Sequence, residues 1–338
     1  MADGDPLEEE EVRALLVRTG LAADAEPLRC ETLAGGVSSD IRRIDLPGRS
    51  LCVKRALARL KVAADWRAPI ERSVHEAGWM EVAHRLCPAN VPQPLGFDRA
   101  TGTLVLPWLD PASHPVWKFE LRDGRVEPAV AATLGGALAA IHRGTAGDPA
   151  IASRFDTGSI FHALRIEPYL LATAKRHPAL APRLHAIARI TADTRRALVH
   201  GDVSPKNVLL GPSGPLLIDA ECAWYGDPAF DAAFCLNHLL LKCLWVPQGV
   251  PALLRSFDAL LRAWLSGADW EPREGLAARV AALLPALMLA RVDGKSPVEY
   301  LTSPGQQEHV RRFAARWLTD PADSPEALAD AWRATLAA

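Results

Sequence analysis

The stretch HGDVSPKN, residues 200–207, is the part of this 338-residue chain that says most about its fold, and DAE at 219–221 follows it. The segments around it, ALVHGD and NVLLGPSGPLLIDAE, are predicted to be β-strands, with a turn at 211–214. An aspartate, an asparagine five residues later and a second aspartate beyond a hairpin would bring three oxygen-bearing side chains together. We expect this strand-turn-strand unit to hold the chemistry of the protein.

This pattern is typical of phosphoryl transfer. That reaction needs a carboxylate near the attacking hydroxyl and oxygen ligands that hold Mg²⁺ against the phosphates, because positioning and charge neutralisation supply most of the rate. An aspartate with an asparagine five residues later and a downstream metal-binding aspartate is the arrangement of a kinase catalytic loop.

The loop resembles that of aminoglycoside phosphotransferases and related small-molecule kinases, in which Gly201 stands where protein kinases have arginine. The resemblance implies that Asp202 is the catalytic base and that Asn207 and Asp219 are Mg²⁺ ligands. It also implies that Glu221 is an auxiliary acid near the metal.

Four neighbouring residues are expected to have supporting roles or have two alternative roles. The resemblance favours His200 as a brace for the loop through hydrogen bonds, rather than as the general base. Lys206 either faces solvent or reaches a phosphate. Asp231 is expected to bond back to the backbone of the catalytic loop, and Asp227 before Pro228 is expected to cap a helix.

The order of elements around the loop predicts the fold class. Residues 27–54 contain short runs separated by glycines and proline, which predict three strands, and 70–86 has helical periodicity. Two more strands are predicted within 93–110, and the rest of the chain is predominantly helical, including a buried helix at 228–245 and others at 128–142, 160–175 and 180–196. We expect an α+β, bilobal protein-kinase-like fold with a small antiparallel-sheet N-lobe and a larger helical C-lobe.

The expected division of the chain follows from this order. Residues 1–24 would form an N-terminal helix or extension, 25–108 the nucleotide-binding lobe, and 109–338 the catalytic and substrate-binding lobe.

Lys54 ends an apolar run, as an ammonium group that projects from a strand toward nucleotide phosphates would. Its expected partner is a carboxylate on the following helix. The resemblance favours Glu76, while Glu71 and Glu81 are alternatives.

Two further segments are candidates for nucleotide binding. Gly35, Gly36 and Ser38 lie in a turn that would cover the phosphates, since glycine permits close backbone approach and serine adds a donor. Pro107 and Leu109 fit an inter-lobe hinge, where the proline carbonyl and the leucine N–H would face adenine.

Two regions are locally similar to methylthioribose kinases. One runs from Lys54 through Trp66 and Arg72 to Glu76, and the other is residues 218–226. The nucleotide turn and the catalytic loop depart from that family's pattern, so the acceptor stays open. Trp66 would be either part of a lid over the acceptor or a packing anchor. Arg291 would either reach a polar substrate or be an ordinary cation at a helix end.

Composition excludes several other classes. Lys and Arg number 38 and Asp and Glu 40, so the net charge of −2 provides no general attraction to nucleic acid. The acidic start is unlike a secretory signal, the apolar run at 280–290 is shorter than the ~20 residues of a membrane span, and the six cysteines lack metal-site spacing. We therefore expect a cytoplasmic protein with free thiols and with neither a membrane nor a nucleic-acid partner.

The sequence thus predicts an ATP- and Mg²⁺-dependent kinase whose partner is a small-molecule hydroxyl acceptor that is sugar-like, aminoglycoside-like or an amino alcohol. A thiosugar kinase of the methylthioribose type is one alternative. A nucleotide-binding pseudokinase that acts as a scaffold is another, and retention of Lys54, Asp202, Asn207 and Asp219 together argues against it. Oligomeric state and ATP versus GTP preference are left open.

Overall fold

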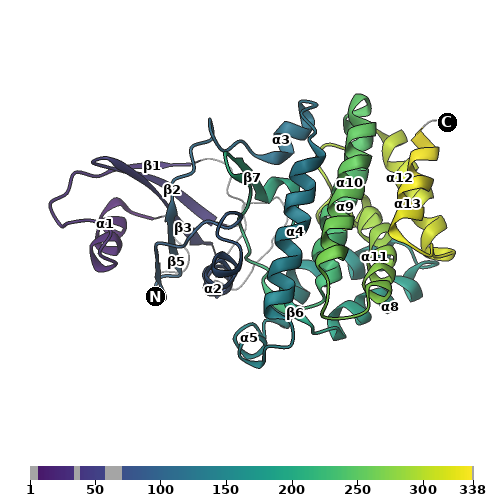
Figure 1. The fold of residues 1–338 in the computed structure, drawn as a ribbon, viewed down its shortest axis with the longest axis horizontal. Coiled ribbons are helices and arrows are strands. Elements are labelled where there is room, and N and C mark those ends of the chain that lie inside the picture. The colour runs from purple at the N-terminus through teal and green to yellow at the C-terminus, as the bar shows by residue number, and fades with distance from the viewer. Residues whose placement is uncertain (1–6, 34–38, 58–70, 337–338) are drawn as a thin grey trace.

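The computed structural model describes residues 7–33, 39–57 and 71–336, and its two lobes are those of a protein-kinase-like α+β fold (Figure 1). The N-lobe contains one antiparallel sheet of five strands in the order β1-β2-β3-β5-β4. Its strands are β1 (Arg29–Thr32), β2 (Ser39–Leu46), β3 (Arg49–Ala56), β4 (Gly96–Asp98) and β5 (Thr103–Pro107). All five strands were predicted.

Helices α1 (Glu9–Arg18) and α2 (Arg72–Leu86) lie on opposite faces of this sheet. Successive side chains of a strand point to opposite faces, so Leu104 joins the core on the α2 side while Val105 joins the core on the α1 side. Leu15 and Leu16 of α1 pack in that second core. The predicted N-terminal extension is therefore packed, through α1, against the face of the N-lobe sheet opposite to α2.

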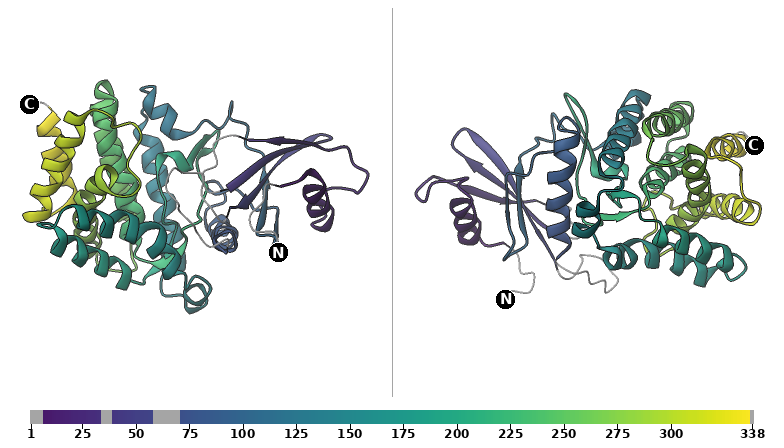
Figure 2. Two further views of the ribbon diagram at one scale, coloured as in Figure 1. Left: turned by 180° about the vertical axis from the view of Figure 1, so that it is seen from behind. Right: turned by 60° about the horizontal axis from the view of Figure 1, so that its bottom comes forward.

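The C-lobe is built mainly from helices, and it extends away from the sheet along the long axis of the molecule (Figure 2). Its longer elements are α4 (Pro128–Thr145), α8 (Ala181–Asp193), α9 (Pro228–Trp245), α10 (Val250–Gly267), α11 (Arg273–Asp293), α12 (Pro304–Thr319) and α13 (Pro325–Leu336). Its shorter elements are α3 (Trp117–Arg122), α5 (Pro149–Arg154), α6 (Gly158–Phe161), α7 (Ala172–Arg176) and single 3₁₀ turns at Pro205–Asn207 and Pro247–Gly249.

The helix predicted at 160–175 has an unusual centre. Between α6 and α7 the chain forms a π-helix, η1 (His162–Leu171), with Pro168 inside it. π-helical turns are rare and frequent at functional sites. This segment passes beneath the catalytic loop.

Helix α9 is the central element of the C-lobe. Every residue from Pro228 to Cys243 is buried, as the apolar character of the segment on all sides predicts. Asp227 caps the helix by accepting a hydrogen bond from the Ala229 N–H at 3.0 Å, with proline at the first helical position.

Two small sheets flank the catalytic loop. The predicted turn at 211–214 joins β7 (Val208–Gly211) to β8 (Gly214–Leu217). The strand before the loop, β6 (Ala197–Val199), pairs instead with β9 (Trp224–Gly226), a strand that the sequence analysis did not predict.

Helix α11 is the one described helix long and apolar enough to pass a composition test for a membrane span. The sequence analysis considered only the apolar run at 280–290, which is shorter than a membrane span, whereas the complete helix has 21 residues. Of its most apolar window, 72% is buried inside the protein. Core helices of soluble proteins pass the same test, and α11 packs against α9 and α12 as such a helix does.

Candidate active site

The catalytic loop depends on glycine at position 201. Gly201 has φ +78°, and a Cβ added there would lie 2.6 Å from the carbonyl oxygen of Cys222. A side chain is therefore excluded both by backbone conformation and by space. This explains why the residue before Asp202 is the smallest one.

Asp231 of α9 fixes the start of the loop, as predicted. Its Oδ2 accepts the His200 N–H and its Oδ1 accepts the Gly201 N–H, both at 2.8 Å. His142 Nε2 lies 3.2 Å from the same carboxylate. Because the indole N–H of Trp264 donates to His142 Nδ1 at 3.0 Å, the proton of the imidazole must be on Nε2, where it donates to Asp231.

His200 is buried and engaged at both ring nitrogens. Its Nδ1 accepts the Asp202 N–H at 3.2 Å, so Nε2 carries the proton and donates to the carbonyl of Ile218 at 3.1 Å. Trp79 packs edge-on against the ring, 4.7 Å between centroids. Burial lowers the pKa of His200 below its usual value even though Asp231 and Asp202 act in the opposite direction. These contacts are those of a brace, and they leave the ring no free nitrogen.

The carboxylate of Asp202 is only 2% exposed, yet it is held in its charged form. Burial alone would raise its pKa, but the charges of Arg165 and Lys206 outweigh burial and lower it. Arg165 Nη2 lies 2.9 Å from Asp202 Oδ2, and its Nε donates to the Gly201 carbonyl at 2.7 Å. Lys206 Nζ lies 3.3 Å from the same oxygen.

Arg165 was missed by the sequence analysis. It comes from the π-helix η1, 37 positions before Asp202, and nothing in its local pattern distinguishes it from the other arginines of the chain. Only the path of η1 beneath the loop brings it to the carboxylate.

Asn207 is tied directly to Asp202. Its Nδ2 donates to the Asp202 carbonyl at 3.0 Å and to Oδ2 at 2.8 Å. This orients the amide and leaves its Oδ1 as the group available to another ligand. The Ile218 N–H donates to the Asn207 carbonyl at 3.1 Å, which brings Asp219, the next residue, beside the loop.

Lys54 of β3 links the two lobes at the site. Its ammonium group lies 2.7 Å from Glu76 Oε1 of α2 and also contacts Asp219 Oδ1. The structure thus places Glu76 against Lys54, whereas Glu81 pairs with Arg154. Asp219 has φ +68°, the left-handed region that aspartate tolerates better than most residues.

The charges in this cluster shift one another's pKa values. Burial would lower the pKa of Lys54, but Asp219 and Glu76 raise it overall. Burial raises the pKa of Glu76 despite Lys54. For Asp219, burial acts to raise the pKa, and the Lys54 charge holds it well below the usual range. Lys54 and Asp219 are therefore a charged pair.

The other predicted residues have different surroundings. Glu221 accepts a hydrogen bond from Arg72 Nε at 3.0 Å, and its role near a metal stays a prediction. Pro107 ends β5 opposite Leu51, and Leu109 lies half-buried just beyond it. Gly35, Gly36, Ser38 and Trp66 lie outside the described residues.

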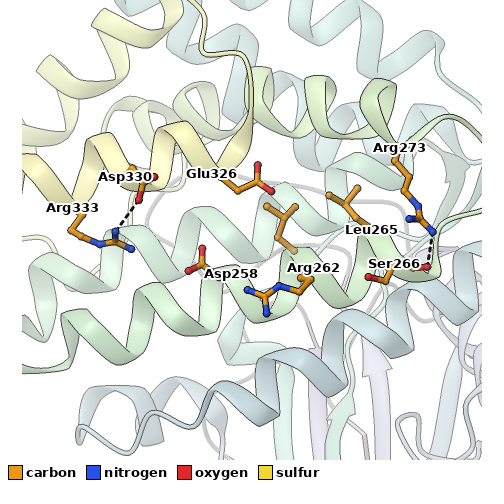
Figure 3. A pocket seen from close by; sticks show the side chains of 9 residues that line it. Asp258, Arg262, Leu265, Ser266, Arg273, Glu326, Asp330 and Arg333 are labelled. Carbon is orange, nitrogen blue, oxygen red and sulfur yellow. Dashed lines mark hydrogen bonds and ion pairs between the residues drawn. The ribbon is translucent and has the colours of Figure 1, made fainter.

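Two cavities are informative. One of about 180 Å³ is bordered by Asp202, Ser204 and Lys206 and by residues of α3, η1, α9 and α11. A larger one of about 460 Å³ lies between α10 and α13, where Asp258 and Arg333 are among its mixed charges (Figure 3). The larger cavity is lined by none of the site residues described above. Of the two, only the smaller cavity is bordered by the catalytic loop.

Comparison with known proteins agrees with this geometry. Methylthioribose kinase 1 of Oryza sativa subsp. japonica is 25% identical over 256 residues, which cover 68% of this chain and 59% of that protein, so the chain matches about three fifths of this relative's length. An ethanolamine kinase of Plasmodium vivax superposes with a TM-score of 0.56 at 10% identity, over 98% of this chain and 90% of that one. The structure of amicoumacin kinase in complex with AMP-PNP and Ca²⁺ superposes with a TM-score of 0.54 at 14% identity, over 94% of this chain and 98% of that one.

These structural likenesses establish the fold. The model of the phosphotransferase enzyme family, which includes the aminoglycoside phosphotransferases, matches residues 29–276, a span that contains Lys54, the catalytic loop and Asp219. On that match, the chain belongs to the phosphotransferase enzyme family.

Proposed function

We propose that this protein transfers the γ-phosphate of ATP, in the presence of Mg²⁺, to a hydroxyl group of a small molecule bound beside Asp202. The observation that carries the proposal is a buried carboxylate, kept charged by Arg165, that borders a cavity and is bonded to Asn207. Membership of the family and the relation to small-molecule kinases support it.

Asp202 would act as the acceptor of the hydroxyl proton. Its charge lets it accept a hydrogen bond from the hydroxyl and orient the oxygen for attack, and it takes the proton as transfer proceeds. Arg165 and Asn207 hold the carboxylate in one position, since each bonds to Oδ2. His200 would stay neutral and hold the loop.

The donor set fits Mg²⁺. Among the described residues there is no group of three or more histidine, cysteine and acidic side chains, but Mg²⁺ in such sites takes one or two protein ligands together with phosphate oxygens and water. The Oδ1 of Asn207 and the charged carboxylate of Asp219 provide two hard oxygen ligands. Bound there, Mg²⁺ would neutralise phosphate charge. Glu221, paired with Arg72, would help to hold this edge of the site.

Lys54 would contact the phosphates of ATP from β3, with Glu76 fixing its position. Pro107 and Leu109 would border the adenine, and Gly35, Gly36 and Ser38 would cover the phosphates. The orientation of Lys54 toward Asp219 supports the first of these assignments, because it places the cation next to a proposed metal ligand.

The test is the substitution Asp202→Asn. Asparagine keeps the size and the hydrogen bonds but removes the charge, so Mg²⁺–ATP binding, followed by thermal shift, should persist. Turnover, followed as ADP formation over a panel of sugars, thiosugars including methylthioribose, amino alcohols, aminoglycosides and hydroxy acids, should fall by about 10²- to 10⁴-fold. Asp156→Asn, at an exposed aspartate paired with Arg195, is the matched control and should leave turnover unchanged.

Three results would contradict the proposal. If wild-type protein binds no nucleotide with Mg²⁺, the assignment of the cofactor is wrong. If it binds nucleotide but transfers phosphate to no member of the panel, the scaffold alternative gains support. If Asp202→Asn transfers phosphate at the wild-type rate, the assignment of Asp202 as the proton acceptor is wrong.

A further inference from the structure

The cavity beside Asp202 is lined by more positive than negative side chains. Its basic lining residues are Lys118, Lys206, Lys242 and Arg291, and its acidic ones are Asp202 and Glu299. Lys118 pairs with Glu299 and Lys206 with Asp202. Within the described part of the chain, Lys242 and Arg291 have no carboxylate partner.

Lys242 is the most unusual of these groups. It lies on α9, its side chain is 1% exposed, and its Nζ has no hydrogen-bond partner among the described residues. The ammonium group lies 4.3 Å from the ring centroid of Trp245 and 4.5 Å from that of Tyr300. A buried ammonium without a hydrogen-bonding or anionic partner is costly, and cation–π contacts recover only part of that cost.

Arg291 adds a second unsatisfied donor to the same cavity. Its Nη1 donates to Tyr169 Oη at 3.2 Å and to Ser296 Oγ at 3.0 Å, which fixes the guanidinium in place. Its buried Nε has no partner among the residues described. Arg291 also borders the proposed acceptor cavity, which supports the first of the two roles expected from the sequence, contact with a polar substrate.

We propose that the acceptor carries an oxyanion, a carboxylate or a phosphate, which binds Lys242 and Arg291 while a hydroxyl of the same molecule lies at Asp202. The inference rests on the proposed function and names its substrate class. An oxyanion would give both cations the partners that they lack, and charged hydrogen bonds of this kind are among the strongest in proteins.

The same arrangement disfavours cationic acceptors. Aromatic cages recognise quaternary ammonium groups, but here the stacked rings of Trp245 and Tyr300, 4.6 Å apart, are already in contact with the cation of Lys242. A second cation in the cavity would meet like charge, which is unfavourable at a binding surface. Choline, ethanolamine and aminoglycosides are therefore expected to be poor acceptors.

Without a bound anion, Lys242 is charged in only part of the molecules at neutral pH. Burial and the nearby Lys118 lower its pKa to about 7, while Glu299 acts in the opposite direction. Burial, Arg291 and Lys242 lower the pKa of His238 well below its usual value, so that imidazole is neutral. An arriving oxyanion would favour the charged form of Lys242.

The test measures anion binding by the full chain with its nucleotide site saturated by Mg²⁺–ADP. Inorganic phosphate, acetate and tetramethylammonium chloride are titrated separately at constant ionic strength and followed by calorimetry. Saturable binding is expected for phosphate, for acetate or for both, and the tighter of the two identifies the anionic group. Lys242→Met should weaken that binding roughly 10- to 150-fold. Lys175→Met, at an exposed lysine of α7, should leave it unchanged.

A stability measurement separates this role from a structural one. If Lys242 serves only as a packing group, Lys242→Met should lower the unfolding midpoint; if it is kept for a ligand, removing a buried charge without an anionic partner should raise it. In the transfer assay, turnover should be higher with hydroxy acids or phosphorylated polyols as acceptors than with amino alcohols.

The proposal is overturned if no anion binds saturably, if anion binding is unaffected in Lys242→Met, or if tetramethylammonium binds more tightly than the anions. All three results would leave the proposed kinase function standing. Failure to bind Mg²⁺–ADP at all would instead count against the proposed function.

Discussion

Replacing Asp231 with asparagine tests whether α9 fixes the catalytic loop by charge. The carboxylate is fully buried and accepts hydrogen bonds from two successive backbone N–H groups of the loop, at His200 and Gly201, and from His142. Asparagine has the same shape but only one acceptor oxygen. If that oxygen keeps the hydrogen bonds from the His200 N–H and from His142, the new NH₂ group faces the Gly201 N–H. Two donors then meet without an acceptor.

The expected loss of stability follows from these contacts. A buried donor left without an acceptor costs about 1–3 kcal/mol, and a hydrogen bond that loses its charged partner weakens by about 1 kcal/mol. Asp231→Asn should therefore lower the free energy of unfolding by about 2–4 kcal/mol. Turnover per folded molecule should also fall, because Asp202 follows Gly201 directly.

Urea denaturation of both proteins, followed by tryptophan fluorescence, measures the first quantity. The matched control is Asp330→Asn, whose aspartate is 70% exposed and pairs with Arg333. It should change stability by less than about 0.5 kcal/mol. An Asp231→Asn protein that unfolds at the wild-type urea concentration and retains full turnover would refute the argument, since the loop would then be held by other contacts.

Three further outcomes are expected. Gly201→Ala should destabilise the protein by about 1–3 kcal/mol in the same assay. At Gly136 a Cβ would meet nothing within 4 Å, so Gly136→Ala should stabilise the protein by about 0.5–1 kcal/mol. The reverse order of stabilities would refute the steric argument. Lys54→Met should weaken Mg²⁺–ATP binding by roughly 10- to 150-fold in calorimetry, and unchanged affinity would exclude a phosphate contact. Arg165→Met should raise the pKa of Asp202, so the acidic limb of kcat/KM should move to higher pH; an unmoved limb would exclude this electrostatic role.

Much of the fold could be predicted from the sequence because local signals were strong. Glycine and proline turns separate the five strands of the N-lobe, and α9 is apolar on all sides. The pairing of β6 with β9 could not be predicted in the same way. Each strand has three buried residues, too few for a periodic pattern, and they meet only because the hairpin between them folds back.

The residues of the candidate site also differ in whether a local sequence pattern identifies them. Asp202, Asn207 and Asp219 are identified by spacing within one short segment, and Lys54 by its place at the end of a strand. Arg165 and Lys242 have no such signal. Lys242 lies within a segment whose neighbours are almost all apolar, so only the packing of α9 against Tyr300 and the cavity reveals that its charge has no partner.

The π-helix η1 has a consequence for how this family member can change during evolution. Each residue turns an α-helix by about 100° and a π-helix by less, because π-helical hydrogen bonds span five residues, so a single deletion that returned His162–Leu171 to α-helix would change the angles between its side chains. Arg165, under the catalytic loop, and Tyr169, beside Arg291, could not both keep their places. The segment should accept many substitutions but no change of length, and a gap here in a homologous sequence should mark a protein with a differently shaped acceptor cavity.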